Sequence, residues 1–376
     1  MARTDLADEP SNPGLSPAAG SLSPLHPTGA GEAVADTADS GRAAGRIATG
    51  AWSRNSSRLG LLIAYLLVVA VFWSMRPDVF SDWTTWRGVL DSSALPAIIA
   101  ISLTVTLVVG EFDLSIGATL GLAMAVCVTM LVEHGMPWPV AAGAALAAAI
   151  GVGTVNGLLI TWAKMNSFIA TLAVSSIVAG LDSHVSGQKT ITTGIPAGFV
   201  DLGVHRYAGI GVPLWVAIAL CLLLYVGLGH TQTGRYLFAI GGNREAARLA
   251  GVRVRWLRGI GMLAAASGAA IAGVLLAAQT ASYYPNAGGG YLLPAYAAAF
   301  LGTAAGGGRF GVLATAFGVL FLQTLQTGLT VLNVASWIVL VVQGVVLAVA
   351  VMVSTFGEGL RIGGLPRLPR TVGRTV

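Results

Sequence analysis

Long apolar runs recur through most of this 376-residue chain, and short polar segments separate them. A segment that crosses the hydrocarbon of a bilayer needs about 20 apolar residues in a helix, because unpaired backbone groups are too costly in lipid. The segment 294–305 is too short to cross squarely, so we expect a broken or tilted half-helix there. The pattern predicts ten membrane helices, at residues 59–75, 94–110, 114–133, 138–163, 167–182, 213–229, 259–281, 294–305, 310–332 and 335–355.

The composition favours the same conclusion. Hydrophobic residues make up 55% of the chain and charged residues only 10%, whereas a soluble domain has about 25% charged residues. We therefore predict an all-α fold, a polytopic helical membrane protein in contact with lipid. No nucleic-acid partner is expected.

The two ends differ from the apolar middle. Residues 1–57 are rich in Pro, Gly, Ser, Ala and mixed charge and contain no apolar run, which is typical of a disordered segment. They lack the apolar core of a signal peptide, so the first helix is expected to act as the insertion signal. The predicted organisation is a disordered cytoplasmic tail at 1–57, a transmembrane domain at 58–356 and a cytoplasmic tail at 357–376.

Arginines predict the orientation, because short loops rich in Lys and Arg stay on the cytoplasmic side. They gather before the first span, within 230–258 and after the last span. Both termini and that loop should therefore face the cytoplasm, which implies the cytoplasmic membrane. An even number of spans agrees, places Lys164 and Arg309 on the same side, and leaves the loop 183–212 outside.

Small residues recur at four-residue spacing in several predicted helices. Such rows let helix backbones approach closely in lipid. Examples are the pairs Gly117 and Gly121, and Gly153 and Gly157, together with a row of Gly and Ala from 261 to 277. A tightly packed bundle is expected.

Two acidic residues lie between apolar runs, in the stretch Val109-Gly-Glu-Phe-Asp-Leu-Ser-Ile-Gly117. A bare carboxylate at bilayer depth costs about 2.5 kcal/mol or more. Either Asp113 or Ser115 caps the next helix, or Glu111 and Asp113 line a translocation path; the two interpretations are compatible. Further polar side chains within the spans could bind a hydroxyl-rich solute, although most such amides bond a neighbouring helix: Asn156, Gln279, Gln323, Gln326 and Gln343.

The loop 234–258 has the signals of one short helix. Asn243 is a good N-cap, Glu245 suits the positive helix start, and Gly251 can take the left-handed position after the helix. A helix of about seven residues is unstable alone. It should therefore either rest on lipid headgroups or dock onto a cytoplasmic partner.

Several of these stretches resemble the permease subunits of ribose-type ATP-binding cassette (ABC) importers, which share a fold with branched-chain amino-acid permeases. The resemblance covers residues 60–355. Val109–Gly117 is similar to the family's Gly-Gly-Ile-Asp-Leu-Ser-Val-Gly, with Glu111 and Phe112 as variations. The other matching stretches are Asn166–Leu172, the coupling-helix loop Gly234–Val252, Pro285–Gly288 and Gly306–Arg309.

This resemblance implies a type II ABC importer permease bundle that works as a homodimer. Its implied partners are ATPase subunits, an extracytoplasmic solute-binding protein and a second permease copy. The candidate translocation path comprises Glu111, Asp113, Asn156 and Asn166. The coupling helix that would meet the ATPase comprises Gly242, Asn243, Glu245, Ala246, Ala247, Arg248 and Gly251.

The chain also departs from the family pattern. After Tyr291, where many members carry acidic residues, it reads Leu-Leu-Pro-Ala295, and the loop 182–206 differs from the common sugar version. The solute, a sugar or a related small polar molecule, therefore stays open.

Catalytic and metal signatures are absent from the sequence, and no cofactor is expected. The two lysines, Lys164 and Lys189, follow Ala163 and Gln188, so no Gly-Lys-Ser/Thr of a P-loop exists. ATP hydrolysis should reside on another polypeptide. One alternative is an ion-coupled secondary transporter in which Glu111 or Asp113 carries a proton; another is a membrane scaffold or enzyme that transports nothing.

Overall fold

The computed structural model describes residues 59–362, without the side chains of residue 305 and of 353–362. The chain divides into two units, Met1–Trp52 and Ser53–Val376. The first unit lies outside the described residues, as do the predicted tail 1–57 and residues 363–376. The features below all belong to the second unit.

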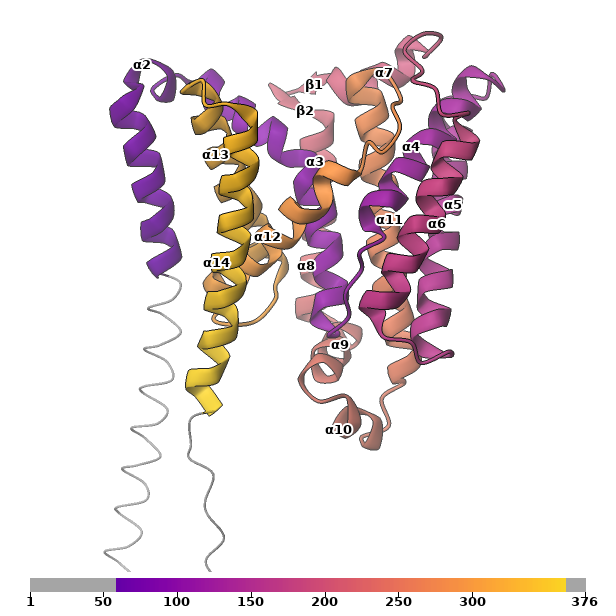
Figure 1. Ribbon diagram of the computed structural model, residues 1–376, viewed down its shortest axis with the longest axis vertical. Helices are drawn as coiled ribbons and strands as arrows, with labels where there is room; N and C mark the ends of the chain where they lie inside the picture. Colours follow the sequence, from indigo (N-terminus) through magenta and orange to yellow (C-terminus); the bar gives the residue numbers. More distant parts are fainter. Residues whose placement is uncertain (1–58, 363–376) are drawn as a thin grey trace, which may run out of the picture. The chain divides into compact units, whose positions relative to one another are not determined.

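Long helices account for most of the described chain (Figure 1). They correspond one for one to the ten predicted apolar segments. Their bounds are Leu59–Met75, α3 (Trp83–Val108), α4 (Ile116–Val132), α5 (Trp138–Thr161), α6 (Ser167–Val185), α8 (Val212–His230), α11 (Val254–Thr280), α12 (Gly289–Ala305), α13 (Val312–Val331) and α14 (Ser336–Ile362).

Length and composition separate these helices into groups. Among the described residues, six are long and apolar enough to cross a membrane: α3, α5, α6, α8, α11 and α13. Leu59–Met75, α4 and the apolar part of α14 at 336–352 are shorter. The 17 residues of α12 contain Pro294, and at 1.5 Å per residue they fall short of a 30 Å hydrocarbon core. That α12 does not cross the membrane squarely stays a prediction.

Three helices begin at least five residues earlier than predicted, and one of them is α11, which starts at Val254 instead of 259. α3 starts at Trp83 instead of 94, because the side chain of Asp82 accepts the Thr84 N–H at 2.9 Å and caps it there. Polar residues such as Arg87 and Asp91 hide this first part of α3 from a hydropathy pattern. α12 starts at Gly289, five residues before the apolar run.

Short elements lie at the two ends of the long helices (Figure 1). At one end, the strands β1 (Arg206–Tyr207) and β2 (Ile210–Gly211) pair antiparallel in a hairpin, so we call it the hairpin end. The same end carries α2 (Pro77–Phe80) and α7 (Ala197–Val204). The α10 end carries α9 (Gln232–Gly242) and α10 (Arg244–Leu249).

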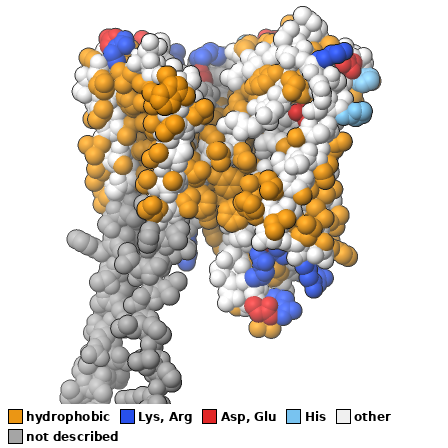
Figure 2. All heavy atoms as spheres, in the orientation of Figure 1, with side chains coloured by type: hydrophobic (Ala, Val, Ile, Leu, Met, Phe, Trp, Pro, Cys, Tyr) orange, Lys and Arg blue, Asp and Glu red, His pale blue; other side chains and the backbone are white. Residues whose placement is uncertain are grey.

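Hydrophobic side chains cover the surface between these two ends (Figure 2). Leu223 on α8 and Ile177 on α6, for example, expose 66% and 62% of their surface. In Figure 2, lysine and arginine gather at the α10 end together with some acidic atoms, and the hairpin end also carries charges of both signs. An apolar band of this kind between two charged ends is typical of helices that face lipid.

The interior is built around α11, which packs against α3, α4 and α5. Small residues make this close approach possible. A Cβ atom added to Gly153 of α5 would lie 2.8 Å from Cβ of Ala266, and one added to Gly157 would lie 3.4 Å from Cα of Gly259. The predicted packing through small residues is confirmed between α5 and α11.

Replacing Gly153 with Ala should loosen this contact, because the added methyl group meets the backbone of α11. Overpacking costs about 1–3 kcal/mol, so we expect the midpoint of thermal unfolding in detergent to fall by about 3 °C or more. Gly151→Ala is the matched control, since nothing lies within 4 Å of its added Cβ. Equal midpoints for the two variants would contradict this packing.

Candidate functional site

The connection between α3 and α4, Val109–Ser115, is a non-helical break among packed helices (Figure 1). Side chains of neighbouring helices satisfy its free backbone donors. Phe112 N–H donates to Ser167 Oγ at 3.2 Å, Asp113 N–H to the Tyr296 hydroxyl at 2.9 Å, and Leu114 N–H to Thr171 Oγ1 at 3.0 Å. Irregular backbone at membrane depth is tolerated only where protein supplies such partners.

Asp113 lies at the centre of a buried polar cluster. Its Oδ1 accepts hydrogen bonds from the Ser115 N–H at 2.9 Å and from Ser115 Oγ at 2.6 Å. Asn156 Nδ2 on α5 donates to Ser115 Oγ at 2.7 Å. Asp113 therefore caps the chain just before α4, as one of the two interpretations expected, while the Ser115 side chain makes no cap bond to the helix.

Glu111 makes a different set of contacts. Its side chain is 3% exposed, and its Oε1 lies 2.5 Å from Arg244 Nη2 and 2.6 Å from Arg258 Nε. Arg244 is the first residue of α10, and Arg258 lies on α11. A buried carboxylate needs such partners; removing one side of a buried pair costs about 3–5 kcal/mol, and less where a partner such as Arg244 is half exposed.

The short helix predicted within 234–258 is present as α10. Asn243 Oδ1 accepts the Ala246 N–H at 2.9 Å, and Gly251 has φ of +82°. Arg248 donates to Glu245 on the exposed face, and this hydrogen bond raises the pKa of Arg248 above its ordinary value. The expected cap and C-terminal glycine are both confirmed.

Some of the residues predicted to dock onto the ATPase are buried in the structure and others are exposed. Ala247 is buried in a cluster with Ile240 and Leu257, so it holds α10 against the protein itself. Glu245 and Arg248 are exposed. Leu249, which sequence reasoning missed, exposes 79% of its surface. A leucine two residues after the buried Ala247 falls on the opposite side of a helix, and that spacing was the available signal.

Asn166 has a local role at the start of α6. Its Oδ1 accepts the N–H groups of Phe168 at 2.9 Å and of Ile169 at 3.4 Å, so it is the N-cap of that helix. Among the four residues proposed for a translocation path, Asp113 and Asn156 thus meet through Ser115. Glu111 and Asn166 lie in other contacts.

A cavity of about 790 Å³ lies toward the hairpin end, between α3, α12, α13 and α14. Gly290 and Pro294 of α12 form part of its wall, and no Asp, Glu, Lys or Arg occurs among its described lining residues. Gln343 Nε2 donates to Gln326 Oε1 at 3.1 Å. Four of the amides that line it are among the polar residues that the sequence suggests for binding a solute: Gln279, Gln323, Gln326 and Gln343.

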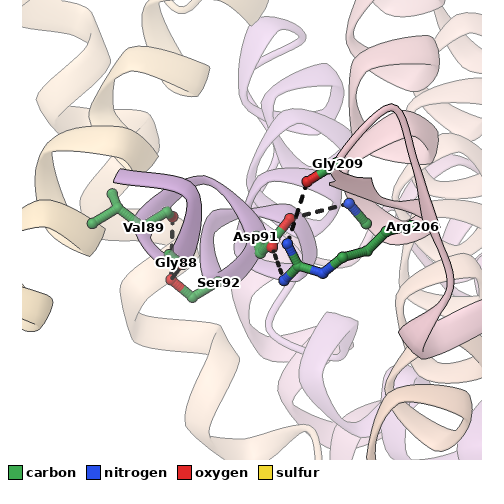
Figure 3. Close-up of polar contacts among 7 residues, drawn as sticks. Gly88, Val89, Asp91, Ser92, Arg206 and Gly209 are labelled. Carbon is green, nitrogen blue, oxygen red and sulfur yellow. Dashed lines mark hydrogen bonds and ion pairs between the residues drawn. The ribbon is translucent and has the colours of Figure 1, made fainter. Parts of the chain in front are cut away.

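The hairpin is fixed to α3 next to this cavity (Figure 3). Asp91 of α3 accepts from Arg206 Nη2 at 2.6 Å and from the Gly211 N–H at 3.2 Å. The Arg206 guanidinium also donates to the Gly209 carbonyl at 3.3 Å. The following residue, Ser92, lines the cavity, so the ion pair holds the hairpin near its wall.

Long apolar helices, a break satisfied from within and a lipid-facing surface define a polytopic, helical, multi-pass membrane protein. Residues 87–351 match the family described as the permease component of the branched-chain amino acid transport system. The chain belongs to this family of transport permeases.

Curated relatives align over most of both chains. The ribose import permease protein RbsC of Escherichia coli (strain K12) is 33% identical over 297 residues, 78% of this chain and 92% of its own. RbsC of Bacillus subtilis (strain 168) is 34% identical over 303 residues, with the same shares. The L-arabinose transport system permease protein AraH of Escherichia coli (strain K12) is 30% identical over 302 residues, 80% and 90% of the two chains.

Asn243→Ala should open α10, because it removes the acceptor of the Ala246 N–H. An N-cap is worth about 1 kcal/mol, or roughly a five-fold change in a local opening equilibrium. Hydrogen–deuterium exchange of the amides from 246 to 250 should therefore become about five-fold faster. Asn243→Asp keeps a cap oxygen and should exchange like the unmodified protein; acceleration in both variants would argue against the cap.

Proposed function

We propose that this chain is the permease subunit of an ABC importer that carries a sugar or related small polar solute across the cytoplasmic membrane. The observation that carries the proposal is α10, a capped helix with a buried side and an exposed side in a member of a transport permease family. The proposal places the α10 end in the cytoplasm. The hairpin end then faces outward, where a solute-binding protein would deliver its load.

The exposed side of α10 has the composition of a docking surface. Leu249 and nearby Trp256 expose 79% and 75% of their surface at an end otherwise rich in arginine. Apolar anchors surrounded by charge favour a protein partner. An ATPase subunit suits this place, because no P-loop lysine occurs in the chain. The proposed docking surface also includes the exposed residues Asn243, Glu245 and Arg248. Ala247 packs on the opposite, buried side of α10 and holds the helix in place.

Gly242, Ala246 and Gly251 complete the proposed docking element around that surface. Their small size keeps the backbone of the α10 segment accessible to a partner. At Gly242 and Gly251 nothing lies within 4 Å of an added Cβ. A second copy of the permease would complete the transporter.

Leu249→Asn should weaken the ATPase interaction, since it replaces an exposed apolar anchor with a polar side chain of similar size. Loss of such an anchor costs about 1–2 kcal/mol of binding, so we expect roughly five-fold or greater loss of co-purified ATPase, with uptake falling in parallel. Leu249→Met keeps the apolar contact and serves as control. Full co-purification with Leu249→Asn would reject α10 as the docking site.

The lining of the cavity favours the binding of an uncharged, hydroxyl-rich solute. Amide groups both donate and accept hydrogen bonds, which matches sugar hydroxyls. A zwitterionic amino acid would need partners for an ammonium and a carboxylate group, and the described lining contains no charged side chain. The names of the relatives, which refer to ribose and L-arabinose, favour a sugar over a branched-chain amino acid.

Gln323→Leu should reduce uptake, because the residue lines the cavity. The ATPase interaction should stay intact, because Gln323 is not part of α10. Loss of one or two hydrogen bonds to a solute is worth about 1 kcal/mol each, so we expect uptake to fall about five-fold. Gln323→Asn retains an amide as control. Normal uptake by Gln323→Leu would remove this side chain from the solute path.

The described residues offer no support for the ion-coupled alternative. A proton carrier must exchange its proton during transport, whereas the Glu111 carboxylate is engaged in ion pairs with Arg244 and Arg258. Asp113 accepts two hydrogen bonds from Ser115. A role for Glu111, Asp113, Asn156 and Asn166 along the path remains a proposal of the sequence, and none of the four lines the cavity.

A further inference from the structure

Glu111 lies where α10 meets the membrane helices. Its carboxylate is buried and shared by Arg244, at the start of α10, and Arg258 on α11. Moving α10 without moving the break would leave a buried charge with one partner fewer, which is strongly unfavourable. Glu111 therefore ties α10 and the break together electrostatically. In this chain it stands where the similar motif has glycine.

The ends of α9 and α11 next to α10 also pack closely against the end of α3 and the start of the break. A Cβ atom added to Gly241, near the end of α9, would overlap the Val108 carbonyl. One added to Gly261 of α11 would lie 3.4 Å from Val109 Cγ2. Displacement of the loop that carries α10 must therefore displace the start of the break as well.

Tyr296 of α12 lies at the other end of the break. Its hydroxyl accepts the Asp113 N–H at 2.9 Å, and its ring stacks on Phe112 with centroids 6.1 Å apart. Tyr296 is itself buried. Two positions away on either side of it, Pro294 and Ala298 line the cavity. The break thus contacts α12 at Tyr296, and neighbouring residues of the same helix line the cavity.

We infer that Glu111 is a positioning residue that transmits movement of α10, through Asp113 and Tyr296, to the α12 wall of the cavity. The inference rests on the proposed function, in which α10 meets the ATPase and the cavity holds the solute. A chain of packed and hydrogen-bonded groups carries coupling only if both ends bias one movable element. Here that element is the break with α12, since α12 is short and contains Pro294.

The test is Glu111→Gln, an isosteric change that removes the charge. The permease is co-expressed with its ATPase subunits and reconstituted with its solute-binding protein in vesicles. ATPase co-purification should be unchanged, while solute molecules imported per ATP hydrolysed should fall about five-fold or more, the size of a typical coupling between sites. A residue with a merely structural role would lower uptake and ATP hydrolysis together and leave their ratio constant.

Asp78→Asn is the matched control, because it breaks the Arg76–Asp78 ion pair, whose side chains are 42% and 64% exposed. Its ratio of solute to ATP should equal that of the unmodified protein. Tyr296→Phe removes one hydroxyl at the far end of the route and should also lower the ratio. The double variant should lose less than the product of the two single effects, as expected for residues that act in one route.

Glu111→Gln with an unchanged ratio would overturn the inference, and so would loss of ATPase co-purification, which would place Glu111 in docking alone. If Glu111→Gln does not fold, Tyr296→Phe decides: an unchanged ratio rejects the route and a lowered ratio supports it. Failure of the unmodified permease to bind an ATPase or to import solute with ATP would instead refute the proposed function.

Discussion

The structure depends on keeping the backbone donors and the two carboxylates of the Val109–Ser115 break satisfied among apolar helices. Three backbone donors bond to side chains of α6 and α12, and Glu111 finds two arginines. Lipid offers no replacement for these partners. An element that moves against the break must therefore carry its bonded partners with it, and this requirement is the basis of the coupling that we infer between α10 and the wall of the cavity.

The sequence predicted the spans because each is an uninterrupted apolar run, and lipid permits one backbone form for such a run. It predicted α10 because Asn243 and Gly251 act on their own backbone. The early start of α3 was not predicted, because Arg87 and Asp91 interrupt the apolar pattern. The Glu111–Arg258 pair was not predicted either, because it joins residues 147 positions apart and no local rule connects them.

The described lining of the cavity contains amide side chains and no charged ones. The absence of charge among the described lining residues limits which solutes find compensating partners there, and the four amides were visible in the sequence as isolated polar residues within spans. What the sequence did not reveal was that they share one space. Asn156 also has a side-chain amide, but that amide donates a hydrogen bond to Ser115.

Pro294 has a consequence for the chemistry of that wall. Proline has no N–H, so the carbonyl of Gly290, four residues earlier in α12, lacks its usual helical donor. Both residues line the cavity. Part of the wall's capacity to accept hydrogen bonds therefore belongs to the main chain, where an alanine scan of side chains would leave it untouched and unseen.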